Sequence, residues 1–233
     1  KNTSSVSCTL HAIKHYYSYL VATDKRKDNP VKSIRLRDKQ SRDIQLQDLF
    51  TAKELELLLE RTERYQRLKN RNRIILSLLI YQGLTNGEIT QLELKDVDLQ
   101  QGTIFVKAGR KTNSRTLKLN ARQMYFFMHY LNEDRPKLLK ESTNKLIVSK
   151  LGTAETGEGI SYLVETSKHL FSNRNLNPKT IRQSVICNLL KQGKDLRVVQ
   201  TFAGHKYPSA TEKYKQTHLE ELKNQVLKFH PLK

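Results

Sequence analysis

Residues 178–214 read PKTIRQSVICNLLKQGKDLRVVQTFAGHKYPSATEKY, and this stretch predicts helices joined by tight turns. Asn177 stands before the proline, and an asparagine cap followed by proline at the first helical position is a typical helix start. Gly193 ends that helix, because glycine readily adopts the left-handed conformation that closes a helix. Asp195 then begins a shorter helix that stops at Gly204. The last third of the chain is therefore predicted to be helical.

Four polar side chains are placed regularly along this stretch. Lys179 and Arg182 are three residues apart and are therefore neighbours on one helix face. His205 follows Gly204 at a chain reversal, and Tyr214 comes nine residues later, near the first turn of the next helix. Each residue alone has an ordinary explanation, since Lys-x-x-Arg pairs are common on surfaces and tyrosines are common in cores. Of these, the cations Lys179 and Arg182 are candidates for binding a phosphate.

The charge of the whole chain points to a polyanionic partner. The 233 residues include 42 Lys and Arg against 23 Asp and Glu, a formal net charge of +19. Such a surplus predicts nucleic acid as the partner, with an anionic membrane surface second. No apolar run reaches the roughly 18 residues that span a bilayer, and no signal-peptide pattern opens the chain. Cys8 and Cys187 are too few for a disulfide scaffold, so we expect a cytosolic protein.

The middle of the chain combines further helices with a hairpin. A capping box at residues 51–54 begins a helix, and another helix over about 70–82 is closed by Gly83. Thr85 or Asn86 caps the helix after it.

Short β signals follow these helices. Residues 104–106 and 115–119 flank the polar segment 109–114 and predict a hairpin with a basic tip. Residues 146–148 are a candidate third strand, and Asn120 caps a helix between the hairpin and that strand.

The chain lacks the motifs of metal-dependent phosphate chemistry. A metal-dependent nuclease needs clustered carboxylates, and Glu54, Glu56 and Glu60 fit the solvated face of a helix instead. No GxxxxGK[ST] loop is present either. We therefore expect no metal and no cofactor, and protein cations remain as the phosphate-binding groups.

The spacing of Arg182, His205 and Tyr214 resembles the C-terminal signature of the tyrosine recombinases, the phage-integrase family. Residues 81–89 and 92–98 resemble that family's helix junction and the segment after it. Lys111-Thr112, within the hairpin, is similar to the turn that holds the family's strand lysine. The resemblance covers nearly the whole chain. It implies the tyrosine-recombinase catalytic-domain fold of the DNA breaking-rejoining enzyme type, mainly α with a small antiparallel β-sheet (α+β).

The resemblance also implies roles for single residues. Tyr214 would attack a DNA phosphodiester and form a 3′-phosphotyrosine, while Arg182 and His205 would bind the scissile phosphate. Lys111 would be the general acid for the departing 5′-oxygen. Lys179, at a position where the family usually has histidine, would contact the phosphate or help to deprotonate the tyrosine. Nearby alternatives to Lys111 are Lys107, Arg110 and Arg115.

One departure from the family pattern affects the expected chemistry. Thr85 stands where the family has its first arginine, and a hydroxyl cannot supply a charge. Losing a charge-assisted contact to the transition state typically costs about 2–4 kcal/mol, or roughly 10²–10³ in rate. Arg110 and Arg115 on the hairpin are candidates to fill the space.

The same resemblance divides the chain. Residues 1–30 are expected to be the C-terminal remnant of a helical core-binding domain, since Ser4 to Pro30 resembles the last helix of that domain, including its terminal Asn-Pro. Residues 31–48 form a basic linker, and residues 49–233 form the catalytic domain. By the same resemblance, a C-terminal helix from about residue 217 is expected to dock on a neighbouring protomer of a DNA-bound tetramer. The alternative is that its apolar stripe, Leu219, Leu222, Val226 and Phe229, packs on its own domain. DNA-contacting candidates are Lys107, Arg110, Arg115, Arg35, Arg37 and Lys39.

Two functional readings remain open. The leading hypothesis is a recombinase that integrates or excises a mobile element by metal-free cleavage of double-stranded DNA in a prokaryotic cytoplasm, associated with the nucleoid. The alternative is a catalytically weak or inactive DNA-binding relative. A type IB topoisomerase and a basic RNA-binding protein fit the motifs less well. Retention of Tyr214, His205, Arg182 and Lys111 together favours activity.

Overall fold

The computed structural model describes residues 3–36, 48–171 and 173–214. Two compact units divide the chain, Lys1–Asp43 and Ile44–Lys233. The predicted DNA contacts Arg37 and Lys39 lie outside the described residues, as does the docking helix from about residue 217.

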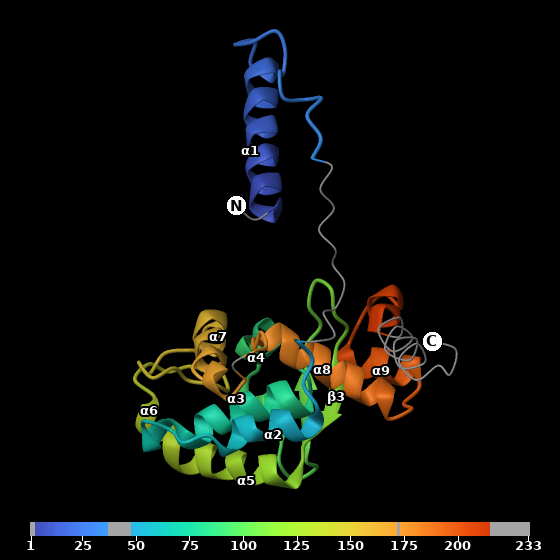
Figure 1. Ribbon diagram of the computed structural model, residues 1–233. Coiled ribbons are helices and arrows are strands. Elements are labelled where there is room, and N and C mark those ends of the chain that lie inside the picture. The colour runs from blue at the N-terminus through green and yellow to red at the C-terminus, as the bar shows by residue number, and fades with distance from the viewer. Residues whose placement is uncertain (1–2, 37–47, 172, 215–233) are drawn as a thin grey trace, which may run out of the picture. The chain divides into compact units, whose positions relative to one another are not determined.

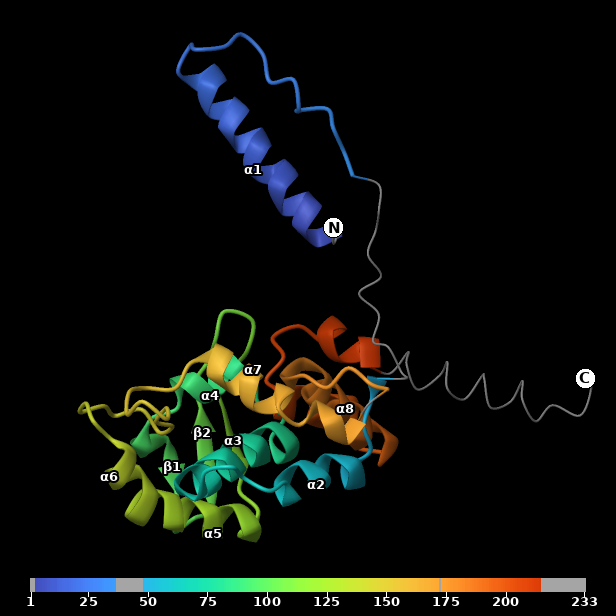
Figure 2. The same cartoon turned by 60° about the vertical axis from the view of Figure 1, so that its left-hand side comes forward.

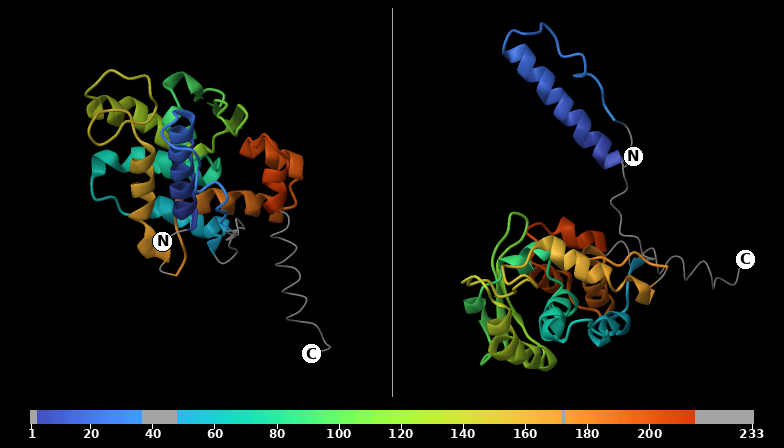
Figure 3. Two further views of the ribbon diagram at one scale, coloured as in Figure 1. Left: turned by 90° about the horizontal axis from the view of Figure 1, so that it is seen from above. Right: turned by 90° about the vertical axis from the view of Figure 1, so that its left-hand side faces the viewer.

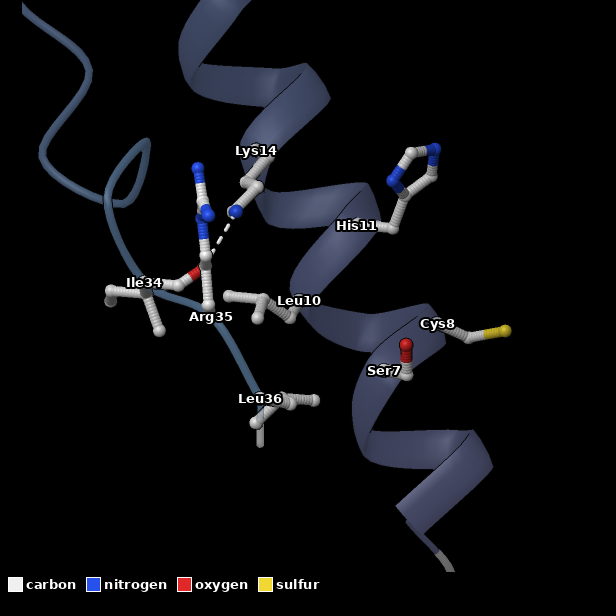
Figure 4. Close-up of a pocket in the computed structure, with 8 residues that line it drawn as sticks. All are labelled: Ser7, Cys8, Leu10, His11, Lys14, Ile34, Arg35 and Leu36. Carbon is white, nitrogen blue, oxygen red and sulfur yellow. Dashed lines mark hydrogen bonds between the residues drawn. The ribbon is translucent and has the colours of Figure 1, made fainter. Parts of the chain in front are cut away.

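The first unit is built on one long helix. Helix α1 spans Thr3–Ala22, within the residues 1–30 that were expected to be helical. The chain then turns back, and Lys14 Nζ donates to the carbonyl oxygen of Ile34 at 2.7 Å. Figure 4 shows this contact beside a shallow pocket that Arg35 also lines. No described side chain of residues 3–36 is buried, so this unit has no apolar core of its own within the described residues.

The core of the second unit is centred on helix α3, Lys69–Tyr81. Residues 74–80 of this helix are all buried, which is typical of a helix enclosed on every side. Helices α2 (Ala52–Glu60), α5 (Ala121–His129) and α8 (Pro178–Lys191) pack against it, as Figures 1 and 2 show. The residues just after α3 belong to the site described below, where Gly83 O accepts a hydrogen bond from Arg182.

A small antiparallel sheet flanks these helices. Strands β1 (Val97–Asp98), β2 (Thr103–Val106) and β3 (Arg115–Lys118) pair in the order β1-β2-β3, with Val106 opposite Arg115. The hairpin and the fold class, mainly α with a small antiparallel sheet, are therefore confirmed.

The strand predicted at residues 146–148 is wrong. These residues are buried, but Leu146 N donates to Leu92 O at 2.9 Å and Val148 forms one isolated bridge with Ala154. The backbone groups of this short buried run bond to separate segments and not to one neighbouring strand. Its apolar sequence nevertheless has the same pattern as a buried strand, and periodicity cannot distinguish the two.

Local capping chemistry sets most helix ends. Thr51, Thr85, Asn120 and Asn177 each form a capping box, which confirms four predicted starts and selects Thr85 over Asn86. Gly83 has φ 59°, the left-handed conformation expected after a helix. Further helices are α4 (Asn86–Gln91), α6 (Arg135–Leu138), α7 (Gly157–Glu165) and α9 (Leu196–Ala203), and residues 209–214 are also helical. A π-helical segment lies at Tyr130–Asp134, and 3-10 turns lie at Gln66–Leu68, Leu94–Asp96 and Lys168–Phe171.

Within the described ranges, none of the helices combines the length and the apolar character needed to cross a bilayer.

The cap of α5 provides a direct test of this local chemistry. Asn120 Oδ1 accepts from Arg122 N at 2.9 Å, and Gln123 Oε1 accepts from Asn120 N at 2.9 Å. We expect Asn120→Ala to lower the free energy of unfolding by about 1 kcal/mol, measured by urea unfolding. Asn120→Asp keeps an acceptor and should retain most of the stability; equal losses in both variants would show that the cap does not contribute.

Candidate active site

Arg182 lies where two helices end. It extends from the second turn of α8, and its residue is only 8% exposed. Its Nη1 donates to Gly83 O at 2.5 Å and its Nη2 to Ala203 O at 2.6 Å. These carbonyls follow α3 and end α9, where unpaired helix carbonyls carry partial negative charge. The guanidinium is therefore held in one position before any ligand arrives.

His205 begins directly after the left-handed Gly204 (φ 70°) that ends α9. Its Nδ1 lies 2.8 Å from the hydroxyl of the buried Thr211. Burial, followed by the charges of Arg182 and Arg115, lowers the pKa of His205 to about 4, so the imidazole is neutral at pH 7. When Thr211 donates to Nδ1, the ring proton is on Nε2, which can then donate to an anion.

Tyr214 stacks beside this imidazole. The two ring centroids are 6.3 Å apart with an interplanar angle of 16°. The tyrosine also packs against a small cluster of Ile186, Val199 and Ala203. Burial raises the pKa of Tyr214 to about 12, even though the charge of Arg182 acts in the opposite direction. The phenol is therefore protonated at neutral pH and needs a proton acceptor to become a nucleophile.

The predicted hairpin reaches this group through its tip. Thr112 forms an isolated bridge with His205, and Asn113 N donates to Gly204 O at 2.8 Å. Lys206 Nζ donates to Arg110 O at 3.2 Å. The hairpin loop and the segment around His205 accordingly lie side by side in Figures 2 and 3. Lys111 is exposed and directly precedes Thr112, the residue that pairs with His205.

The hydroxyl of Thr85 is hydrogen-bonded within the helix that it caps, α4. Its hydroxyl accepts from Glu88 N at 3.2 Å and donates to Glu88 Oε2 at 3.0 Å. Its one hydroxyl proton is therefore already used within the capping box. Burial alone would raise the pKa of Glu88, but the hydrogen bond and charge of Arg115, together with the backbone of Thr85, lower it. Glu88 is consequently a buried carboxylate anion.

Arg115 is buried within this site, although it follows the exposed tip of the hairpin. Its Nη1 is 2.7 Å from Glu88 Oε1, and its side chain is only 3% exposed. A Cβ at Gly204 would clash with its guanidinium, so the glycine leaves the space that Arg115 fills. The sequence named Arg115 as an alternative to Lys111, as a DNA contact and, with Arg110, as a candidate to fill the space at Thr85. It could not choose among these roles, because the pairing that buries Arg115 involves residues far apart in the chain.

The structure does not bring the other candidates into this group. Lys179 is exposed on the first turn of α8, and Arg110 is exposed at the hairpin tip. Lys107 Nζ lies 2.9 Å from Glu93 Oε1, and this hydrogen bond raises the pKa of Lys107. A raised pKa is unfavourable for a general acid. Arg35 belongs to the first unit.

Clusters of three or more His, Cys, Asp or Glu side chains suited to a metal ion do not occur among the described residues.

Solved structures show which class of protein has this architecture. XerA recombinase matches with a TM-score of 0.63 and 21% identity, covering 100% of this chain and 78% of its own. XerH recombinase bound to its palindromic difH substrate matches with a TM-score of 0.69 and 24% identity, over 90% of this chain and 63% of its own. The fold is that of tyrosine recombinase catalytic domains, as predicted.

Sequence comparison then establishes the family. The model of the phage integrase family matches residues 48–221, and the chain belongs to that family of tyrosine-type site-specific recombinases. Tyrosine recombinase XerC of Lacticaseibacillus casei is 26% identical over 232 residues, which is 98% of this chain and 76% of the relative. Tyrosine recombinase XerD of Staphylococcus haemolyticus is 33% identical over 189 residues, 80% of this chain and 63% of the relative. The family resemblance is confirmed.

The lowered pKa of His205 predicts a pH-dependent stability. The folded pKa of about 4 lies below the ordinary value of 6.5, so the unfolded chain binds more protons between these values. Stability should therefore fall as the pH falls from about 6.5 to about 4. His205→Gln should lose this part of the pH dependence in urea unfolding measured at pH 7 and pH 4.5. The variant of the exposed His169, His169→Gln, serves as the control, and an identical pH response in wild type and His205→Gln would contradict the assignment.

Proposed function

We propose that this chain cleaves and rejoins double-stranded DNA through a 3′-phosphotyrosine formed on Tyr214, and so integrates or excises a mobile element. The observation that carries the proposal is the convergence of Arg182, His205 and Tyr214, each held by contacts within the domain. Cations and neutral hydrogen-bond donors fixed beside a tyrosine are suited to an in-line attack on a phosphodiester.

The proposed step exchanges one phosphoester bond for another. Tyr214 Oη attacks phosphorus, its proton passes to water, and the bond to the 5′-oxygen breaks. Lys111 protonates that oxygen, while Arg182 and His205 Nε2 bind the nonbridging oxygens. Because the phosphotyrosine retains the bond energy, a 5′-hydroxyl from a second strand can reverse the attack without ATP.

The domain assignments are part of this proposal. Residues 49–233 would be the catalytic domain, residues 1–30 a remnant of the core-binding domain and residues 31–48 a basic linker. The division into two compact units and the unburied side chains of α1 support a helix taken from a larger domain. The helix from about residue 217 would dock on a neighbouring protomer, giving a homo-tetramer on DNA. Its proposed contact residues are Leu219, Leu222, Val226 and Phe229.

Similar proteins support DNA as the substrate. XerH is described in complex with difH DNA, and the Tn1549 transposon integrase in complex with circular intermediate DNA. The latter matches with a TM-score of 0.65 and 17% identity, over 95% of this chain and 80% of its own. A weakly active DNA-binding relative is the second candidate, because the hydroxyl of Thr85 is already bonded to Glu88.

The nucleophile can be tested with suicide substrates. Duplexes are first enriched for binding from a randomised pool, then nicked at successive positions and incubated with the protein without metal. We expect a covalent protein–DNA band that resists SDS and is absent for Tyr214→Phe, which lacks the attacking oxygen. Tyr207→Phe changes a tyrosine that is 69% exposed and should retain the band. DNA binding without any adduct would favour the weakly active relative.

The general acid can be tested with a better leaving group. Lys111→Ala should slow cleavage by about 10²–10⁴ on an ordinary substrate, because the 5′-oxygen then departs unprotonated. A 5′-bridging phosphorothiolate, whose thiolate leaves without a proton, should restore most of the rate. Lys107→Ala is the comparison variant; rescue of that variant instead of Lys111→Ala would assign the acid to Lys107.

A further inference from the structure

We propose that Arg115 supplies the phosphate-binding charge that the family obtains from an arginine at the position of Thr85. The inference rests on the proposed function, since it assigns a further residue to the same phosphate site. Arg115, on strand β3, would then be the catalytic residue that takes the place of the arginine at the start of α4 in the family.

The first support is that Arg115 is buried with donors to spare. Its Nη1 is bonded to Glu88, but neither its Nε nor its Nη2 has a hydrogen-bond partner among the described residues. A guanidinium presents five N–H donors, and leaving buried donors unpaired is unfavourable. Donors kept in this state are suited to an acceptor that arrives with the substrate, and the planar fork of arginine matches two phosphate oxygens.

The second support is that Arg115 shares its surroundings with Arg182. Glu88 Oε1 binds Arg115, and Glu88 Oε2 lies 3.6 Å from Arg182 Nη1. The charges of both arginines act on His205 and lower its pKa, so the three side chains surround one region. Two positive charges against one carboxylate leave one positive charge, which matches the single negative charge of a phosphodiester.

The third support is the place where Arg115 reaches the helix. It contacts Glu88, the third residue after Thr85, and so approaches the first turn of α4 from the neighbouring strand. Along β3 the residues alternate between buried and exposed, and Arg115 takes the buried face with Leu117. A charged residue on the core face of a strand is unusual unless it is paired or functional. Thr85 keeps its role as helix cap, and the charge comes from β3.

The test compares a charged with a neutral scissile phosphate. Arg115→Gln should slow adduct formation on the phosphodiester by roughly 10²–10³, while binding of the same duplex stays nearly unchanged. On a methylphosphonate, which has no negative charge to neutralise, the difference between Arg115→Gln and wild type should shrink to less than about tenfold. Arg122→Ala removes an exposed arginine that also pairs with a glutamate, Glu56, and should match wild type on both substrates.

Other outcomes would overturn the inference. An equal loss on both substrates would mean that Arg115 only supports the fold, and an unchanged rate on the phosphodiester would mean that it has no role. If Arg115→Gln fails to fold, Arg115→Gln/Glu88→Gln removes the unpaired carboxylate as well and is assayed in its place. Absence of an adduct from wild type would overturn the proposed function too, whereas a wild-type adduct with an undiminished variant rejects this inference alone.

A second variant tests whether the pocket is already filled. Thr85→Arg adds the family's arginine but removes the cap of α4. If Arg115 occupies the phosphate pocket, the added charge is redundant, and the cleavage rate should stay the same or fall. Acceleration by tenfold or more would show that the pocket is vacant in the wild type and would overturn the assignment to Arg115.

Discussion

The structure of the site depends on one buried carboxylate. Glu88 closes the capping box of Thr85, pairs with Arg115 and lies close to Arg182. A helix start, a strand and a second helix are thereby joined through a single side chain. A buried carboxylate is stable as an anion only when charged partners and hydrogen bonds surround it, and removing one partner leaves the others uncompensated. The positions of the two arginines are therefore linked, because each contributes to keeping Glu88 ionised.

Backbone groups at helix ends and one glycine also fix the positions of the two arginines. Arg182 binds two backbone carbonyls, and a side chain at Gly204 would occupy the space of the Arg115 guanidinium. The left-handed backbone of Gly204 also favours glycine at this position. The same residue therefore ends α9 and leaves room for Arg115 in the site. These contacts hold the cations in place within the protein, which reduces the reorganisation needed when charge develops on a phosphate.

Much of the fold follows from local chemistry, and that part was predictable. The predicted helix caps at Thr51, Asn120 and Asn177 depend on nearby residues, and the structure confirms all three as helix starts. Residues 146–148 were predicted wrongly, since a buried apolar segment and a strand have the same pattern over three residues. The family was recognisable because its signature combines several spacings along the chain.

The environment of Arg115 was not predictable in the same way. Its burial results from Glu88 and Gly204, which are distant in sequence, and no local pattern records such a contact. Lys107 and Arg115 are both basic and lie near the hairpin, yet one is bonded to Glu93 and the other to Glu88. Only the three-dimensional arrangement separates Lys107, which is paired with Glu93 and Asp96, from Arg115, which retains unpaired donors in the site.

The hydrogen bond between His205 and Thr211 has a consequence for how the site can be switched off. Thr211 lies three residues before Tyr214 in the same short helical segment, residues 209–214. A displacement of that segment would move Tyr214 and the hydroxyl that contacts His205 together, so the stacked phenol and the hydrogen bond that orients the imidazole would be lost in one movement.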